Sequence, residues 1–445
     1  MFQPEIETMT REQLRELQSQ RLTDLVARLY EHVPYYRERL SEAGVSPGDV
    51  RSIDDITKLP ITRKDDVQNN YPFGLLAVPR SELARVHASS GTTGKPTVMG
   101  YTRGDLDVFA EVNARSLAAA GATPGMVFHN AYGYGLFTGG LGLHGGGERL
   151  GLTVVPVSGG MTERQIGLIL DLRPGIIACT PSYAQTLAEE FRRRGISPEE
   201  IPLQYGILGA EPWTEAIRAD VEAGLGIKAS NIYGLTEVIG PGVANEAHDE
   251  GQGSYLWEDH FYPEILDRDT GDPVPDGEEG VLVITTLTKE GVPLLRYWTG
   301  DITNITHEPG PSGRTHARIG LIRGRSDDMM VIRGVNVYPT QIEAALQLVS
   351  QASAHYQLIV RRQGTLDELE LKLELTPEAF NRVGQGVLEG GIIEVDRKVD
   401  ELRAHIQHKI RDIVGIGVKV TLMGPGEVPR SAGGKLRRIV DERKL

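Results

Sequence analysis

The stretch Ser89-Ser90-Gly91-Thr92-Thr93-Gly94-Lys95-Pro96 is the sharpest signal in this sequence. It lies between two short apolar runs, residues 83–88 and 97–101, which we predict to be strands. Glycines let backbone amides close around a phosphate, while the hydroxyls add donors and the lysine adds positive charge. A hairpin turn needs only one or two such residues, so this composition favours a phosphate-binding loop. The spacing is not the Walker pattern, and a strand rather than a helix follows, which disfavours a P-loop ATPase.

Alternating helix and strand patterns surround this loop and indicate a large α/β domain. Thr10 and Gln13 form a capping-box pattern ahead of an amphipathic helix at residues 10–31, which Pro34 closes. Up to about residue 300, apolar runs alternate with helical patterns, as is typical of a largely parallel sheet. The predicted strands are 152–157, 175–179, 205–208 and 281–286, and the predicted helices are 166–172 and 183–194. We expect an N-terminal domain over residues 1–326, with residues 1–80 as a helical lead-in.

The pattern changes after about residue 327 to that of a small α+β domain. Helices are predicted at 340–349 and 395–414, and strands at 356–361, 368–375 and 419–422. This unit, residues 327–445, has the size of an independent small domain. We place the boundary near Asp327.

Composition narrows the classes of partner. The chain has 445 residues, which is more than one hydrophobic core usually serves. Its 47 basic and 61 acidic residues give a net charge of −14, which disfavours nucleic acid and an anionic membrane surface as partners. No stretch is apolar and long enough to span a bilayer, and the start has no secretory signal pattern. Cys179 is the only cysteine and lies in a predicted buried strand. We therefore expect its side chain to act as a small buried hydrophobic group, and we expect the protein to work in a reducing cytoplasm.

Three further segments carry side chains suited to nucleotide chemistry. Tyr233-Gly234-Leu235-Thr236-Glu237 combines a ring, a hydroxyl and a carboxylate, which could stack a base, contact a phosphate and hold Mg²⁺. Asp301, at the end of Tyr297-Trp298-Thr299-Gly300-Asp301, could accept from ribose hydroxyls, but a lone aspartate there is more often a turn residue. Lys435 lies in a polar stretch near the C-terminus, and taken alone it fits a solvated basic tail better than a catalytic site.

In this order the motifs resemble those of the adenylate-forming superfamily, and more closely those of the phenylacetate–CoA ligases. The resemblance extends over nearly the whole chain and rests on residues 89–102, 132–140, 209–213, 233–237, 257–264 and 324–343. It implies an α/β fold, in which a large adenylate-forming domain with mixed and parallel sheets precedes a small mobile α+β domain. It also implies an acid–thiol ligase that uses ATP, Mg²⁺ and coenzyme A to make an aryl-AMP and then an aryl-CoA.

The resemblance assigns roles to individual residues. It implies nucleotide-binding roles for Ser89, Ser90, Gly91, Thr92, Thr93, Gly94, Lys95, Glu211, Tyr233, Gly234, Asp301 and Arg325. It implies that Tyr132, Phe137 and Ala210 line the aryl pocket, with Tyr134 nearby. Lys435, Thr236 and Glu237 would be catalytic, with Glu237 also the Mg²⁺ ligand and Asp327 the hinge.

Two departures from the family pattern bear on the reaction. Trp298 stands where the superfamily usually has arginine, and Gly145 where phenylacetate enzymes are expected to have tyrosine. Gly145 removes bulk near the expected acyl site, which makes a benzoate-type acid such as anthranilate or hydroxybenzoate an alternative to phenylacetate.

Transfer to a carrier protein is a further alternative. A nucleotide sensor without catalysis is disfavoured by Glu237 and Lys435, and a nucleic-acid binder with a basic tail by the net charge. A homodimer is expected by resemblance alone.

Overall fold

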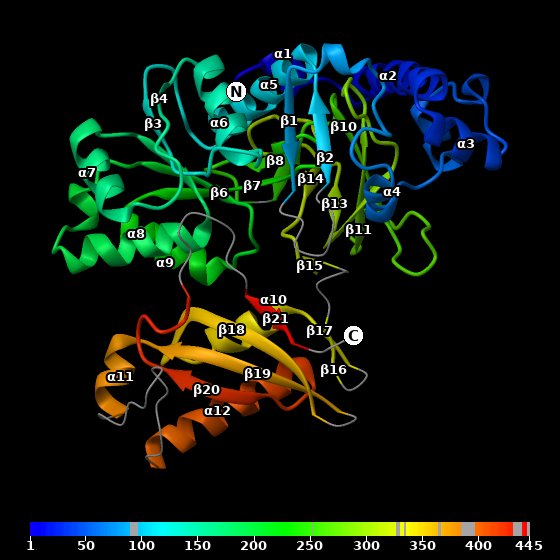
Figure 1. Cartoon of the computed structure of the whole chain (residues 1–445). Coiled ribbons are helices and arrows are strands. Elements are labelled where there is room, and N and C mark those ends of the chain that lie inside the picture. The colour runs from blue at the N-terminus through cyan, green and yellow to red at the C-terminus, as the bar shows by residue number, and fades with distance from the viewer. Residues whose placement is uncertain are drawn as a thin grey trace.

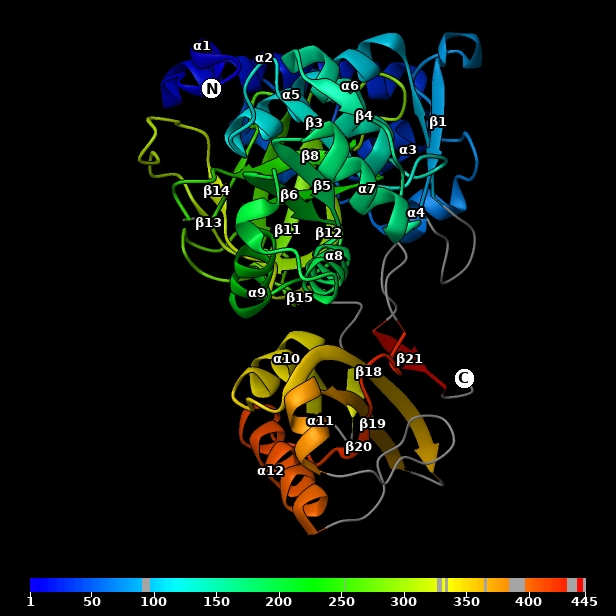
Figure 2. The same ribbon diagram turned by 90° about the vertical axis from the view of Figure 1, so that its left-hand side faces the viewer.

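The described residues form two lobes. The computed structural model describes residues 1–89, 97–251, 253–325, 330–332, 335–363, 366–383, 397–429 and 438–442. A large lobe carries the N-terminus, and a small lobe carries the C-terminus below it (Figure 1). The view turned by 90° shows the same two bodies (Figure 2). No helix in these residue ranges combines the length and apolar character that crossing a membrane requires.

The N-terminal helices cover one edge of the large lobe. Helix α2 (Arg11–His32) begins at Thr10, whose hydroxyl accepts from the Gln13 amide, and the Gln13 side chain accepts from the Thr10 amide at 3.0 Å. The predicted capping box is therefore confirmed. Pro34 does more than close this helix, because it begins α3. The other helices of this region are α1 (Pro4–Glu7), α3 (Pro34–Glu42), α4 (Lys64–Asn69) and 3-10 turns at Pro47–Asp49, Ile53–Lys58 and Arg80–Glu82.

A mixed sheet forms the centre of the large lobe. In the described part of the chain it has nine strands, in the order β13-β14-β9-β8-β7-β6-β5-β3-β4. Strands β4, β3, β5, β6 and β7 are parallel, as the alternating pattern predicts, and the remaining pairs are antiparallel. The bounds are β3 (Val127–Asn130), β4 (Thr153–Val155), β5 (Ile176–Cys179), β6 (Tyr205–Gly209), β7 (Lys228–Leu235), β8 (Gly240–Glu246), β9 (Ser254–Leu256), β13 (Ile305–Thr306) and β14 (Arg318–Ile319).

Helices cover both faces of the parallel strands. Alternate residues of β5 point to opposite faces, so Ile176 and Ala178 join one core and Ile177 and Cys179 join another. The first core contains α5 (Arg103–Ala119) and α6 (Gly139–Leu150). The second contains α7 (Thr162–Leu172), α8 (Pro181–Arg193) and α9 (Glu215–Leu225), and a 3-10 turn lies at Pro198–Glu200. Cys179 is fully buried, as expected, and burial raises the pKa of its thiol.

Two smaller sheets complete the large lobe. Strands β10 (Phe261–Leu266), β11 (Gly280–Thr286), β12 (Tyr297–Thr303) and β15 (Gly324–Arg325) pair antiparallel in that order. Strands β1 (Arg85–Ala88) and β2 (Val98–Tyr101) form an antiparallel hairpin, in which Ala88 pairs with Val98. The predicted phosphate loop joins these two strands.

The small lobe has the expected α+β character. Its sheet has the order β20-β19-β18-β21, and α10 and α12 share its core, with Leu358 and Ile406 among the buried residues. The bounds are β16 (Met330–Ile332), β17 (Val335–Val337), α10 (Pro339–Gln347), β18 (Ala352–Gln363), β19 (Leu366–Leu375), α11 (Pro377–Val383), α12 (Arg397–Val414), β20 (Lys419–Met423) and β21 (Ile439–Asp441). The predicted fold class is confirmed, whereas the proposed boundary at Asp327 lies outside the described residues.

Candidate active site

The stem of the phosphate loop is closed by a pair of hydroxyls. Ser89 Oγ lies 2.9 Å from Thr97 Oγ1 and accepts from the Thr97 amide at 3.0 Å. The Ser89 amide in turn donates to the Thr97 carbonyl at 3.0 Å. These bonds fix the two ends of the loop. Its predicted ligands Ser90, Gly91, Thr92, Thr93, Gly94 and Lys95 lie outside the described residues.

The carboxylate of Glu237 lies against this stem. Its Oε1 accepts from the Thr97 hydroxyl at 3.0 Å, and the residue is 9% exposed. Mg²⁺ prefers oxygen ligands, commonly one or two carboxylates together with phosphate oxygens and water. A nearly buried carboxylate beside the stem of the predicted phosphate loop therefore fits that ion. Thr236 precedes it and is half-buried, with its carbonyl 3.5 Å from the Tyr101 hydroxyl.

The predicted adenine and ribose residues meet at the edge of two sheets. The Tyr233 hydroxyl, on β7, donates to Asp301 Oδ2, on β12, at 2.6 Å. Asp301 also pairs across the sheet with Arg325 of β15. Three residues far apart in sequence are thus neighbours. The guanidinium of Arg63 lies 4.5 Å from the ring centroid of Trp298, on β12.

Lys289 is a contact of Glu237 that the sequence patterns did not predict. Its Nζ is buried and donates to the Glu237 carbonyl at 3.0 Å. Burial lowers the pKa of Lys289 to about 8, although the charges of Asp105 and Glu237 oppose the shift. Because the ammonium holds the backbone of Glu237, it fixes where the carboxylate of that residue can lie. A single lysine in the turn after β11 carries no pattern that would have revealed this contact.

The predicted aryl-site residues come from the loop between β3 and α6. Tyr132 is buried, and its pKa is raised by burial and by the nearby Cys179 and Glu211. The hydroxyl of Tyr134 accepts from Asn130 Nδ2 at 2.9 Å and lies 3.1 Å from His144 Nδ1. Asn130 and His144, neither of them predicted, therefore hold this ring in place.

Two sequence-based interpretations of this region remain predictions. A carbon added to Gly145 would lie 3.5 Å from Ala110 Cβ of α5, so this glycine faces a neighbouring helix. The inference that Gly145 removes bulk near the acyl site remains a prediction, because this contact does not fix where a tyrosine ring at this position would lie. Phe137 is 54% exposed in the arrangement seen, so its predicted contact with an aryl ring remains a prediction.

Ala210 and Glu211 lie at the end of β6 with a restrained backbone. Ala210 has φ +71°, in the left-handed region that residues other than glycine rarely adopt. Such strain is typical of functional sites, where surrounding structure enforces it. Glu211 Oε1 accepts from the Ser182 amide, at the start of α8, at 2.6 Å. The predicted nucleotide-binding role of Glu211 is therefore compatible with its position but remains a prediction.

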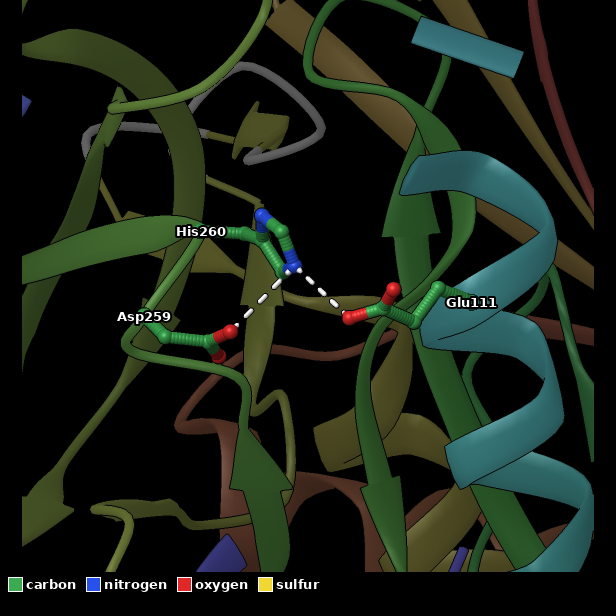
Figure 3. Close-up of side chains that lie close together, drawn as sticks. All are labelled: Glu111, Asp259 and His260. Atoms are coloured by element: carbon green, nitrogen blue, oxygen red, sulfur yellow. Dashed lines mark hydrogen bonds and ion pairs between the residues drawn. The ribbon is translucent and has the colours of Figure 1, made fainter. Parts of the chain in front are cut away.

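A second polar cluster explains the 257–264 motif differently. Glu111, Asp259 and His260 place three potential metal ligands within 4.8 Å of one another (Figure 3). However, the guanidinium of Arg115 lies 2.7 Å from Asp259 Oδ1 and 2.5 Å from Glu111 Oε1. Burial raises the pKa of Glu111, but bonds and charges from His260 and Arg115 lower it to about 2. The cluster is thus an arginine-centred ion-pair network that ties α5 to the loop before β10.

The small lobe meets the large lobe near these residues. Lys435 lies outside the described part of the chain, but Arg438, three residues later, is within it. The charge of Glu211, in the large lobe, contributes to raising the pKa of Arg438 against the opposing effect of burial. The charges of Arg438 and Glu211 therefore interact between the two lobes.

Family models and similar proteins define the class to which this chain belongs. The family described as AMP-binding enzyme matches residues 54–288, and the AMP-binding enzyme C-terminal domain matches residues 334–443. The Phenylacetate-coenzyme A ligase of Thermus thermophilus is 64% identical over 444 residues, covering 100% of both chains. That of Aromatoleum evansii is 50% identical over 438 residues, covering 98% of this chain and 96% of the relative. The chain belongs to the phenylacetate–CoA ligase family of AMP-binding enzymes.

A solved relative also distinguishes between arrangements of the lobes. The postadenylation state of 2-hydroxyisobutyryl-CoA ligase, bound to R3-HIB-AMP, aligns with a TM-score of 0.89 and 28% identity. The thioesterification state of that ligase, with 2-HIB-AMP and CoA, gives 0.72 and 30%. Each alignment covers 99% of this chain and 92% of the other. Because both are states of one ligase, the difference indicates that the lobes here are arranged as in the postadenylation state.

Proposed function

We propose that this chain joins an aromatic carboxylic acid to AMP and then transfers the acyl group to coenzyme A. The observation that carries the proposal is the pairing of Thr97 with Glu237 at the stem of the predicted phosphate loop, together with the pairing of Tyr233 with Asp301. The 64% identity to a Phenylacetate-coenzyme A ligase supports phenylacetate as the acid. A benzoate-type acid remains the alternative, because Gly145 removes bulk near the proposed acyl site.

In the first step, a carboxylate oxygen of the acid bonds to the α-phosphorus of ATP, and pyrophosphate leaves. Catalysis of such a transfer is mainly positioning and neutralisation of charge on phosphoryl oxygens. Residues Ser89 to Lys95 would hold the phosphates, Thr236 would contact the α-phosphate, and Tyr233 and Asp301 would orient the nucleoside. Lys435 would neutralise charge where the carboxylate meets the phosphate.

Glu237 would hold the Mg²⁺ ion, with Lys289 fixing its backbone. When bound, the ion supplies neutralisation of phosphate charge. The nearly buried carboxylate of Glu237 supports this role as the Mg²⁺ ligand.

In the second step, the thiol of coenzyme A attacks the acyl carbonyl of the mixed anhydride, and AMP leaves. This chemistry needs different groups at the same site, so we propose that the small domain, residues 327–445, rotates about Asp327. The residues 333–338 would then replace Lys435 at the site. A two-state small domain is a known way to serve two steps at one site.

A panel of acids tests the substrate. Phenylacetate, anthranilate, hydroxybenzoate and a medium-chain fatty acid should be compared by pyrophosphate release with coenzyme A present. We expect phenylacetate to give the highest kcat/KM, and equal or better turnover of the fatty acid would overturn the aryl assignment.

Replacing coenzyme A by a carrier protein with its pantetheine arm tests the alternative acceptor. A cytoplasmic homodimer completes the proposal, and light scattering of the purified chain would test its oligomeric state.

A further inference from the structure

A bulge at the start of β18 reaches the large lobe. Ala352 pairs with Leu375 and Tyr356 pairs with Leu373, so three residues of β18 stand opposite one residue of β19. Such an insertion bends the strand and redirects its side chains. We call residues 352–356 the docking bulge. Ala354, at its centre, packs against the apolar core that α7, α8 and α9 share in the large lobe.

The docking bulge also makes a polar contact with α8. His355 Nε2 lies 2.9 Å from Oε1 of Glu189 in the large lobe. The side chain of His355 is 6% exposed, whereas that of Glu189 is 47% exposed. The histidine is therefore buried by the contact between lobes, with a carboxylate at the rim as its partner.

Arg438 connects this contact to the segment that bears Lys435. Its Nη1 donates to the Ala354 carbonyl at 3.4 Å and lies 3.4 Å from Glu343 Oε1. Its guanidinium lies 4.7 Å from the ring centroid of Tyr356, and the side chain is 12% exposed. The residue three positions after Lys435 is thus held by the docking bulge itself.

We propose that Glu189, His355 and Arg438 are positioning residues that hold the small lobe in the arrangement that forms the acyl-adenylate. The proposal rests on the proposed function, because it requires two half-reactions that use different lobe arrangements. Glu189 and His355 belong to different lobes, so rotation of the small lobe separates them. The docking contact thus stabilises the adenylating arrangement and is absent from the arrangement that forms the thioester.

The test uses Glu189→Ala, His355→Ala and the double variant in the full-length chain. Acyl-adenylate formation is followed by ATP–pyrophosphate exchange, and thioester formation by single turnover of supplied acyl-AMP with coenzyme A. Glu190→Ala is the matched control, because Glu190 is also on α8 but pairs with Arg193 and Arg194 of its own lobe. Because Glu189 is partly exposed, we expect each single variant to lose about threefold to tenfold in exchange.

Thioester formation should stay within about twofold of the unvaried chain or become faster. The double variant should lose less than the two single losses multiplied together, because Glu189 and His355 share one interaction. Equal losses in both half-reactions, or unchanged exchange in Glu189→Ala, would overturn the docking proposal. Should His355→Ala fail to fold, Glu189→Ala decides alone, since it changes a partly exposed helix residue to a good helix former. Absence of exchange in the unvaried chain with every acid would instead overturn the proposed function and this inference with it.

Discussion

Glu237 and Lys289 show how single residues set up the site. The carboxylate of Glu237 is presented to the phosphate loop, while its carbonyl is held from behind by the buried ammonium of Lys289. A rigid ligand placed in advance avoids reorganisation when charge develops in the reaction. Motif analysis finds the first of these residues because it belongs to a dense polar pattern. It cannot find the second, because only tertiary packing brings Lys289 beside β7.

Replacing Glu237 by glutamine should abolish most acyl-adenylate formation. The amide keeps the shape but loses the charge that suits Mg²⁺, so we expect a loss on the order of 10²-fold in pyrophosphate release. Excess Mg²⁺ should restore part of the rate. Glu290→Gln is the control, because Glu290 accepts from Thr102 rather than facing the loop. Near-normal activity of Glu237→Gln at sub-millimolar Mg²⁺ would contradict the assignment.

The lowered pKa of Lys289 predicts that the free energy of unfolding depends on pH. Its pKa is about 8 in the fold against 10.5 as the ordinary value. Between these values the unfolded chain binds the proton and the folded chain does not, so this group adds stability as pH rises. Relative to Lys289→Met, the unvaried chain should gain about 2 kcal/mol in free energy of unfolding between pH 8 and 10.

Denaturant unfolding of both proteins across that range measures this difference. Lys228→Met is the control, since Lys228 is an exposed lysine on β7 whose removal takes no buried charge from the protein. Parallel stability curves for the unvaried chain and Lys289→Met would show that Lys289 is not held as described.

Close backbone approaches shape the elements that carry the site. A carbon added to Gly234 of β7 would lie 1.9 Å from the Gly240 carbonyl, at the register shift between β7 and β8. Gly234 separates Tyr233 from Thr236 and Glu237, so the shift places these side chains along the site. Helix α6 uses the same device, since carbons added to Gly142 and Gly146 would meet α5 within 3 Å.

Gly234→Ala should therefore disturb both stability and catalysis. Forcing a methyl group into this contact typically costs about 1–3 kcal/mol. Pyrophosphate release should fall as well, since β7 would have to move away from β8. Gly167→Ala on α7 is the matched control, because nothing lies within 4 Å of its added carbon. That change should stabilise the helix by about 0.5–1 kcal/mol. Equal stability of the two variants in chemical unfolding would contradict the packing argument.

Some of these elements could be predicted from sequence and others could not. Strands β5 and β6 match their predicted positions to within one residue at each end, because they are short apolar runs bounded by polar turns. Helix α6 was not predicted, since its sequence GGLGLHGGGERL has poor helix propensity. Strand β8 was also missed, because Glu246 carries a charge into a buried position where Arg218 pairs with it at 2.8 Å. Tertiary contacts, rather than local pattern, decide both.

At the scale of the whole molecule, distant parts of the chain come together within the large lobe, and the small lobe contacts it. The large lobe contributes the phosphate-loop stem, Glu237 and the Tyr233–Asp301 pair. The small lobe contributes Arg438, whose charge interacts with that of Glu211. Sequence motifs predicted which segments take part, because the family pattern names them. They could not predict the docking bulge, because its residues Ala354 and His355 matter only once the lobes meet.

The most direct test of the account is to measure both half-reactions on Lys435→Ala. Removing one preorganised charge from a transition state typically costs on the order of 10²–10³ in rate. We predict a loss of that size in acyl-AMP formation from acid and ATP, with conversion of supplied acyl-AMP and coenzyme A to the thioester nearly unchanged. Equal losses in both half-reactions, or no loss in either, would contradict a site that two arrangements of the small lobe serve in turn.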